Sequence, residues 1–487
     1  MHKYGWQKVL IGWLTALVVT IGWLALIPQQ ASADEPTYTF ATNNTFAPFE
    51  IQDSKGGYSG NNPGIEIEML KEIAKHEHFK VEFKPMSFNG DLQALEAGQV
   101  DAMMAGMSVT DERKQKYDFS TAYYTSGVVM AVAKNSNITS MKQLKGKTVS
   151  AKSGTSAALF LKKNQAKYGY KIRYFDSSNT MWNDVVNGNT VATFDDGPVL
   201  QYGIKQGMKL KIVTKKPIDA QPVAIAFQKG KNLELQKKIN SGIKWMKDTG
   251  RLQKIINRYT KGNETSQTST ASRSIWGLIK ANRAALLSGL WMTIELTVVG
   301  IIFAMIFGVI LGILGVVQNK FANAVSSTII YIFRGIPMIV LAFFIYMGIP
   351  NLTGHKIPLF IAGILTLTLD EGAYIGAIVK GGFDSVPQGQ WEAARSLGLP
   401  YGKALRKVIA PQGFKLMIPS LVNQFIITLK DTSILSAIGV MELTQTGTVI
   451  ISQNMEGFKM WLIIGVMYII IITLLTWLSN YVQRRMV

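Results

Sequence analysis

Apolar positions divide the chain into three kinds of segment. Residues 10–27 form one continuous apolar run. From about residue 37 to 259, short strand-like runs alternate with amphipathic helical stretches, of which residues 66–78 are typical. After residue 275 the apolar runs are long enough to cross a bilayer. The strand-like runs are residues 37–42, 81–86, 101–106, 127–134, 147–151, 191–194 and 223–228. This pattern predicts an α/β domain followed by an all-α membrane domain.

The N-terminal apolar run has the features of a secretory signal. Basic residues Lys3 and Lys8 precede it, and the small residues Ala31-Ser32-Ala33 follow it. We therefore expect residues 1–33 to be a cleaved signal peptide. The alternative is an uncleaved N-terminal helix, because the run is long enough to remain as an anchor.

The C-terminal part predicts a multi-pass cell-membrane protein. If the α/β domain is extracellular, the first span runs inward, which places Lys320, the polar segment around Glu392 and Arg484-Arg485 in the cytoplasm. Basic residues then lie on the side that the positive-inside rule expects. The five expected spans are residues 286–317, 325–348, 358–379, 416–440 and 460–482.

Composition excludes several classes of function. The net charge of +20 could indicate nucleic acid, but the basic residues flank the spans and are scattered over the α/β part. We therefore expect no nucleic-acid partner. The chain has no cysteine, which rules out disulfides and thiolate metal sites. We expect no metal, no cofactor and no catalytic residue in this chain.

A basic, amphipathic segment at residues 392–412 lies between two expected spans. Its Glu-Ala-Ala opening and Gly398 resemble the EAA loop of ABC-importer permeases. The resemblance implies that a short helix here inserts into a cleft on an ATP-hydrolysing subunit, and the coupling residues are Glu392, Ala393, Ala394 and Gly398. The alternative is an ordinary basic cytoplasmic loop. Residues 333–337, 385–392 and 429–433 also resemble permeases of polar amino-acid ABC importers.

Five runs in the α/β part resemble extracellular binding proteins for polar amino acids, most closely the glutamine-binding ones. They are residues 41–50, 85–88, 105–113, 117–120 and 152–155. The resemblance implies a periplasmic-binding-protein-like bilobal α/β domain with two hinge strands, fused to an all-α transmembrane permease domain of about five helices. The expected divisions are the signal at 1–33, the binding domain at 34–262 (lobe 1 at 34–127 and 224–262, lobe 2 at 128–223), a flexible linker at 263–275 and the permease at 276–487.

The resemblance also implies a site for a free amino acid. The planar fork of Arg113 suits a carboxylate, and by resemblance it binds the α-carboxylate. The ligand ammonium is expected at Asp196. The other expected contacts are Ser108 and the backbone around Thr155 and Ser156 for the carboxylate, the Gly106 carbonyl for the ammonium, and Phe46 and Phe88 on either side of the aliphatic stem.

Three residues bear on the ligand side chain. Lys152 can donate to a carbonyl oxygen and opposes a cationic side chain. Asn43 and Asp195 stand where glutamine-binding relatives usually carry Asp and His. Asn43 can still bond an amide, and Asp195 can accept from an amide NH₂ while repelling a carboxylate. We therefore expect glutamine rather than glutamate, with glutamate or asparagine as alternatives.

The implied function is ATP-driven import by a fused binding and permease subunit that is not itself an enzyme. No GxxxxGK[ST] loop is present, so ATP hydrolysis is expected on a separate ATPase subunit, and a homodimer through the permease is expected. The alternatives from another class are an amino-acid-sensing membrane receptor, which would end in a signalling element, and a ligand-gated channel, whose pore would interrupt the binding domain.

Five charged residues fall within the expected spans, and they either line a cavity or pair with one another: Arg334, Asp370, Glu371, Lys430 and Asp431.

Overall fold

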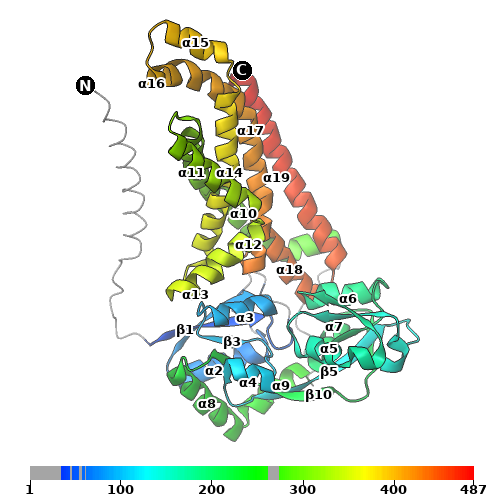
Figure 1. Ribbon diagram of the computed structural model, residues 1–487. Helices are drawn as coiled ribbons and strands as arrows, with labels where there is room; N and C mark the ends of the chain where they lie inside the picture. The colour runs from blue at the N-terminus through cyan, green and yellow to red at the C-terminus, as the bar shows by residue number, and fades with distance from the viewer. Residues whose placement is uncertain (1–34, 44–45, 54–56, 61, 261–273, 487) are drawn as a thin grey trace.

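The computed structural model describes residues 35–43, 46–53, 57–60, 62–260 and 274–486. An α/β domain with two lobes lies at one end of an elongated helical domain (Figure 1). The expected signal at 1–33 and almost all of the expected linker lie outside the described residues. The fold class expected from the sequence is confirmed.

Lobe 1 is built on a five-stranded sheet in the order β2-β1-β3-β11-β4. The strand β1 pairs in parallel with β2 and β3, whereas β11 is antiparallel to β3 and β4. The strands are β1 (Thr37–Asn43), β2 (Lys80–Met86), β3 (Ala102–Met104), β4 (Tyr117–Phe119) and β11 (Ala226–Gln228). The helices are α2 (Ile65–His76), α3 (Phe88–Glu96), α4 (Asp111–Lys116), α8 (Leu233–Asp248) and α9 (Arg251–Thr260).

Lobe 2 is built on a six-stranded sheet in which β10, β5, β8, β6 and β7 follow one another and β9 pairs with β5. Its strands are β5 (Tyr124–Ala133), β6 (Thr148–Lys152), β7 (Lys171–Phe175), β8 (Thr193–Asp196), β9 (Leu210–Ile212) and β10 (Ile218–Val223). Its main helices are α5 (Ser156–Tyr168), α6 (Ser178–Val186) and α7 (Gly197–Lys205). The parallel strands β6 and β8 both end at the edge that faces lobe 1, where ligands bind in such sheets.

The chain crosses between the lobes twice, at neighbouring positions. Ser120 N donates to Ile225 O at 2.9 Å, and Tyr123 N donates to Val223 O at 3.0 Å. Because β5 already belongs to the lobe 2 sheet from Tyr124 onward, the first crossing lies a few residues before the expected boundary at 127/128. The expected strand 223–228 is divided between two strands. Val223 ends β10 in the lobe 2 sheet, and Ala226–Gln228 form β11 in the lobe 1 sheet.

The helical domain has three helices that could each cross a membrane, and up to five spans if each bent pair counts as one. The three are α10 (Ile275–Val316), α14 (Leu359–Asp384) and α19 (Gly457–Met486). The bent pairs are α11 (Lys320–Gly335) with Met338–Thr353, at 98°, and Tyr401–Ile438 with α18 (Leu443–Asn454), at 48°. The larger bend falls at Ile336-Pro337, because proline lacks an N–H and holds the residue before it extended.

The helices α10 and α14 approach each other closely through glycine. A Cβ at Gly308 would lie 2.6 Å from both the Gly372 carbonyl oxygen and the Ile375 Cβ. Small residues allow such backbone contact between helices in a membrane, where dispersion rather than the hydrophobic effect drives association.

We predict that Gly308→Val destabilises the purified full chain by about 1 to 3 kcal/mol or more, because the added atoms overpack this contact. Thermal unfolding in detergent measures the effect. Gly381→Val, on α14 with nothing within 4 Å of its Cβ position, is the matched control. Equal melting temperatures for the two variants would contradict the packing argument.

Candidate functional site

Arg113 lies in the cleft and joins the two lobes. It sits in α4, whose N-cap Thr110 accepts a hydrogen bond from the Arg113 backbone N–H at 3.2 Å. The guanidinium donates to Ser108 O in lobe 1 at 2.9 Å and to Gly154 O in lobe 2 at 2.8 Å. It also lies 5.5 Å from the centre of the Phe88 ring. The lobes are therefore closed on a buried cation.

Asp196 faces this cation from lobe 2. It ends β8, and Ser126 Oγ donates to its carboxylate. Burial raises the pKa of Asp196 to about 7, and the neighbouring Asp195 adds to the rise, while Lys152 and Arg113 oppose it. Asp195 Oδ1 accepts the Asp196 backbone N–H at 2.9 Å. Two adjacent buried carboxyls thus favour a cation in front of them.

Lys152 ends β6 and is 1% exposed. Its Nζ lies 5.2 Å from the centre of the Phe46 ring in lobe 1. Burial lowers the pKa of Lys152, whereas Asp195 and the other acids around it oppose the change. Thr155 then caps α5 by accepting the Ala158 N–H at 3.3 Å, and Ser156 is the first residue of that helix. Backbone N–H groups at a helix start suit an anion.

Phe46 and Gly106 form the lobe 1 side of the cleft. Gly106 has φ +60°, and a Cβ there would lie 2.1 Å from Phe46 Cε1, so only glycine allows the ring this position. The Gly106 N–H donates to Glu66 Oε1 at 3.0 Å. Asn43 ends β1 beside this group, and its N–H donates to Glu50 Oε2 at 2.9 Å.

The residues expected at the ligand site come from six elements and the loops beside them, at the edges where the two lobes face each other. They are Asn43, Phe46, Phe88, Gly106, Ser108, Arg113, Lys152, Thr155, Ser156, Asp195 and Asp196. Sequence reasoning missed three fully buried acids near them, Glu50, Glu66 and Asp91. Asp91 could have been found, because it lies three residues after Phe88 and therefore shares its helix face.

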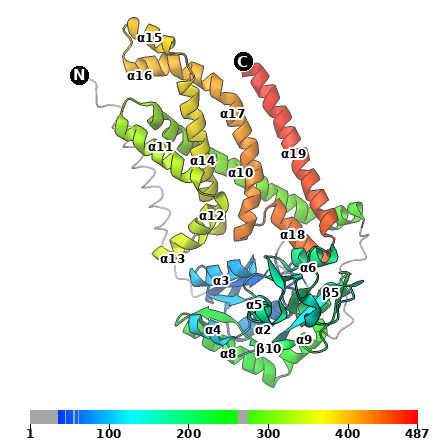
Figure 2. The same ribbon diagram turned by 45° about the vertical axis from the view of Figure 1, so that its right-hand side comes forward.

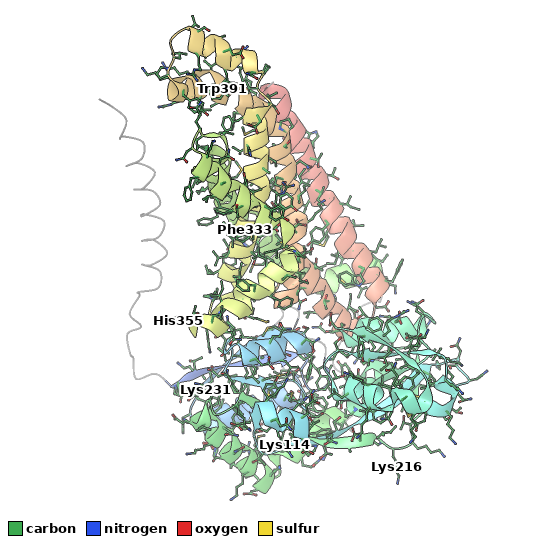
Figure 3. The ribbon with its side chains drawn as sticks, in the orientation of Figure 1. Lys114, Lys216, Lys231, Phe333, His355 and Trp391 are labelled. Atoms are coloured by element: carbon green, nitrogen blue, oxygen red, sulfur yellow. The ribbon has the colours of Figure 1, made fainter. Side chains whose placement is uncertain are left out.

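Both lobes rest on the helical domain. From lobe 1, Gln99 donates its side-chain amide to the Tyr346 carbonyl in the π-helical turn η2 (Phe344–Gly348), and Asp101 Oδ1 lies 3.2 Å from Lys356 Nζ. From lobe 2, Asn183 Nδ2 lies 3.5 Å from where a Gly457 Cβ would be. In Figure 3, His355 marks the end of the helical domain at this interface.

A cavity of about 460 Å³ lies within the helical domain. Arg334 lies 4.9 Å from the centre of the Tyr374 ring, and Gln424 donates to Glu371. The charged and polar lining residues are Arg334, Asp370, Glu371, Tyr374, Gln424 and Asp431. Within the described part of the chain, no ion pair joins the five charges expected in the spans. Lys430 is exposed instead.

The EAA segment forms a helical hairpin at the far end of the helical domain. The helix α15 (Gln388–Ser396) is followed by a turn at Gly398, which has φ +80° and donates its N–H to Arg395 O at 2.9 Å. After the turn, α16 (Tyr401–Ala404) continues through η3 (Leu405–Ile409) into α17 (Ala410–Asp431). Trp391 stacks on Tyr401 at 5.0 Å. Figures 1 and 2 show α15 and α16 opposite the α/β domain.

Comparison with known proteins accounts for both domains. Residues 38–262 match the family of bacterial extracellular solute-binding proteins, family 3, and residues 286–487 match the binding-protein-dependent transport system inner membrane component. The glutamine transport system permease protein GlnP of Escherichia coli K12 is 34% identical over 212 residues, which cover 43% of this chain and 97% of that protein. The arginine transport system permease protein ArtQ of Bacillus subtilis is 29% identical, covering 41% and 92%.

A solved structure was also similar: the second substrate binding domain of a putative amino acid ABC transporter from Streptococcus pneumoniae. It is 43% identical, covers 46% of this chain and 99% of that chain, and has a TM-score of 0.35. Fold and families together define a receptor joined to a permease, both of them transport components rather than enzymes. The chain belongs to the polar amino-acid ABC importers, as a fused substrate-binding and permease subunit.

We predict that cysteines at Asn183 and Gly457 form an intramolecular disulfide on mild oxidation, because their side-chain positions nearly touch across the interface. The native chain has no cysteine, so the background is clean. A mobility shift in non-reducing gel electrophoresis measures it. Lys216 points away from the helical domain in Figure 3, and a cysteine there paired with one at Gly457 is the control. Equal yields for both pairs would contradict the docked arrangement.

Proposed function

We propose that this chain captures L-glutamine outside the cell and passes it through its own permease into the cytoplasm. The observation that carries the proposal is the pair of opposite charges held on opposite lobes, Arg113 and Asp196, which match the carboxylate and ammonium of one free amino acid. Ser108, the Gly106 carbonyl and the start of α5 add polar contacts. Phe46 and Phe88 then pack against the aliphatic stem.

A neutral amide side chain fits the remaining groups better than a charged one. Lys152 supplies a donor and disfavours a basic side chain, while Asp195 disfavours a carboxylate. The glutamine permease among the relatives supports this choice. Because an arginine permease is also among them, the experiment must compare glutamine with a basic amino acid. Glutamate and asparagine remain the alternatives within the same class.

Transport in this proposal needs a separate ATPase and a second copy of the chain. The hairpin of α15 and α16 lies farthest from the binding domain, so an extracellular receptor places Glu392, Ala393, Ala394 and Gly398 in the cytoplasm. Its acidic and basic side chains are exposed, as a docking surface requires. A groove lined by Arg334, Ser420, Asn423 and Gln424 puts polar groups on the membrane domain's surface, which a homodimer would cover.

The cavity around Asp370 and Glu371 is then part of the translocation path. Ionisable residues inside a membrane domain usually line such a path, because burial without a partner is costly there. Reconstitution of the full chain with its ATPase in liposomes, followed by uptake of labelled glutamine, tests the function as a whole. Uptake of arginine but not of glutamine would overturn the substrate assignment.

We predict that Arg113→Ala lowers the glutamine affinity of the purified full chain by at least about 100-fold. Two charge-assisted hydrogen bonds, at about 1.5 to 3 kcal/mol each, account for that loss. Equilibrium binding of labelled glutamine in nanodiscs measures it. Lys114→Ala changes the exposed cation next along the chain, which Figure 3 shows on the outer surface, and should leave affinity unchanged. Equal affinities for the two variants would contradict the placement of the carboxylate.

We predict that Gly398→Val lowers ATP-driven uptake at least about tenfold and leaves glutamine affinity unchanged. Nothing lies within 4 Å of its Cβ position, so the effect comes from the left-handed backbone, which valine resists by about 1 to 2 kcal/mol. Gly389→Val, in α15 and equally open, is the control for added bulk. Full uptake by Gly398→Val at normal expression would remove the hairpin from the coupling mechanism.

A further inference from the structure

The side-chain end of the cleft holds one ammonium among several carboxyl groups. Lys152 comes from lobe 2, and the acids that act on its charge are Asp195 and Asp196 from the same lobe with Glu50 and Asp91 from lobe 1. All are at least nine-tenths buried. A single buried cation thus faces more acids than it can pair with, and Asp196 is already assigned to the ligand ammonium.

Asp91 stands out because neither of its carboxylate oxygens is used. Within the described residues, both Oδ atoms of Asp91 and Nζ of Lys152 are shielded from solvent and have no hydrogen-bond partner. Asp91 is 0% exposed in the first turn of α3, on the helix face that also carries Phe88. Unpaired buried groups of this kind cost free energy unless something bonds them.

The loop that follows Lys152 lies against the start of α3, since a Cβ at Gly154 would be 3.4 Å from Phe88 Cδ1. Lys152 and Asp91 thus belong to neighbouring segments of the two lobes. Burial raises the pKa of Asp91 well above its usual range, and Lys152 is the first influence that opposes the rise. No ion pair within 4.0 Å joins them in the part of the chain that the structure describes. A ligand group placed between them needs one acceptor for the ammonium and one donor for the carboxylate. A primary carboxamide has both, on adjacent atoms.

We propose that Asp91 and Lys152 together read the end of the ligand side chain, as a matched acceptor and donor for a carboxamide, and that Lys152 is the one cation this part of the cleft admits. The inference deepens the proposed function and rests on it. Glutamine leaves the count of charges unchanged. An arginine side chain would add a second cation beside Lys152, and a glutamate side chain would add a carboxylate beside Asp91.

Each partner therefore excludes a different class of substrate. Without Lys152, the acids lose their cation and a basic side chain can supply it. Without the charge of Asp91, Lys152 loses one of its two lobe 1 counter-charges, with Glu50 as the other, and an acidic ligand side chain can supply the missing one. The two substitutions should shift specificity in opposite directions, which a general loosening of the cleft would not do.

The test is equilibrium binding of labelled glutamine, arginine and glutamate to the full chain in nanodiscs. Lys152→Met removes the ammonium and keeps the stem. We expect the ratio of arginine to glutamine affinity to rise at least about 100-fold, because a like-charge contact disappears for arginine while glutamine loses a charge-assisted bond. Lys163→Met on the exposed face of α5 is the matched control and should leave the ratio unchanged.

Asp91→Asn is the second arm and changes charge at nearly constant shape. It removes a buried acid that has no bonded partner, so it should fold at least as well as the unmodified chain. We expect the ratio of glutamate to glutamine affinity to rise about tenfold or more. Asp118→Asn, at an exposed ion pair with Lys229, is its control.

The outcomes are distinct. An unchanged glutamate ratio in Asp91→Asn, or an unchanged arginine ratio in folded Lys152→Met, would overturn the inference. If the unmodified chain itself binds arginine or glutamate more tightly than glutamine, the proposed substrate fails, while the two ratios still decide the roles of Lys152 and Asp91. If Lys152→Met does not fold, the Asp91→Asn ratio decides alone.

Discussion

The hydrogen bond from Arg113 to the Gly154 carbonyl is the contact on which the closed cleft depends. It carries a buried cation from lobe 1 to the backbone of lobe 2, immediately before the start of α5. A buried charge is tolerated only with bonded partners, so separating the lobes changes the environment of Arg113 more than that of any apolar neighbour. A ligand carboxylate bound to the same guanidinium would stabilise the closed state, since it neutralises the charge that closure buries.

The contacts between the α/β domain and the helical domain involve both lobes. Lobe 1 contacts the helical domain through Gln99 and Asp101, and lobe 2 contacts it through α6 at Asn183. These contacts lie on two bodies whose relative position is set at the crossings near Ser120 and Val223. Both sets of contacts are made at the lobe angle described here, so a change in that angle would alter at least one of them.

Strand alternation and family resemblance were sufficient to predict the bilobal fold, while the ligand contacts that they assign stay a prediction. The expected lobe boundary at 127/128 lies slightly after the first crossing, because Thr125 and Ser126 are polar and the apolar run becomes visible only at Gly127, whereas β5 already starts at Tyr124. The sequence analysis treated residues 325–348 as one span. The structure bends this part of the chain by 98° between Lys320–Gly335 and Met338–Thr353. Length and hydropathy cannot report such a bend, although Ile336-Pro337 gave a local signal.

Asp91 was missed for a different physical reason. A single acid in an amphipathic helix is usually solvated, and the spacing of three residues from Phe88 is the one local sign that Asp91 faces inward. Only the three-dimensional arrangement brings it opposite Lys152, which is distant in the chain and lies on the other lobe. Specificity that depends on two lobes meeting is therefore the part of the site that local sequence patterns describe least well.

One stretch of chain, Tyr401–Ile438, runs from the EAA turn past the cavity of the helical domain to the surface of lobe 1. It begins at the EAA turn, where Tyr401 stacks on Trp391. Midway it carries Gln424 and then Asp431, both of which line the internal cavity. Just beyond its end, a Cβ at Gly439 would lie 3.0 Å from both Met86 Cγ and the Pro85 carbonyl oxygen of lobe 1. The stretch is helical throughout but changes type twice, at the π-helical turn Leu405–Ile409 and at the 3-10 segment Thr432–Ile438, and α17 contains Pro419. It therefore joins the EAA turn, the cavity and the lobe 1 contact by continuous backbone, with Pro419 and the π-helical turn as the places where it can bend.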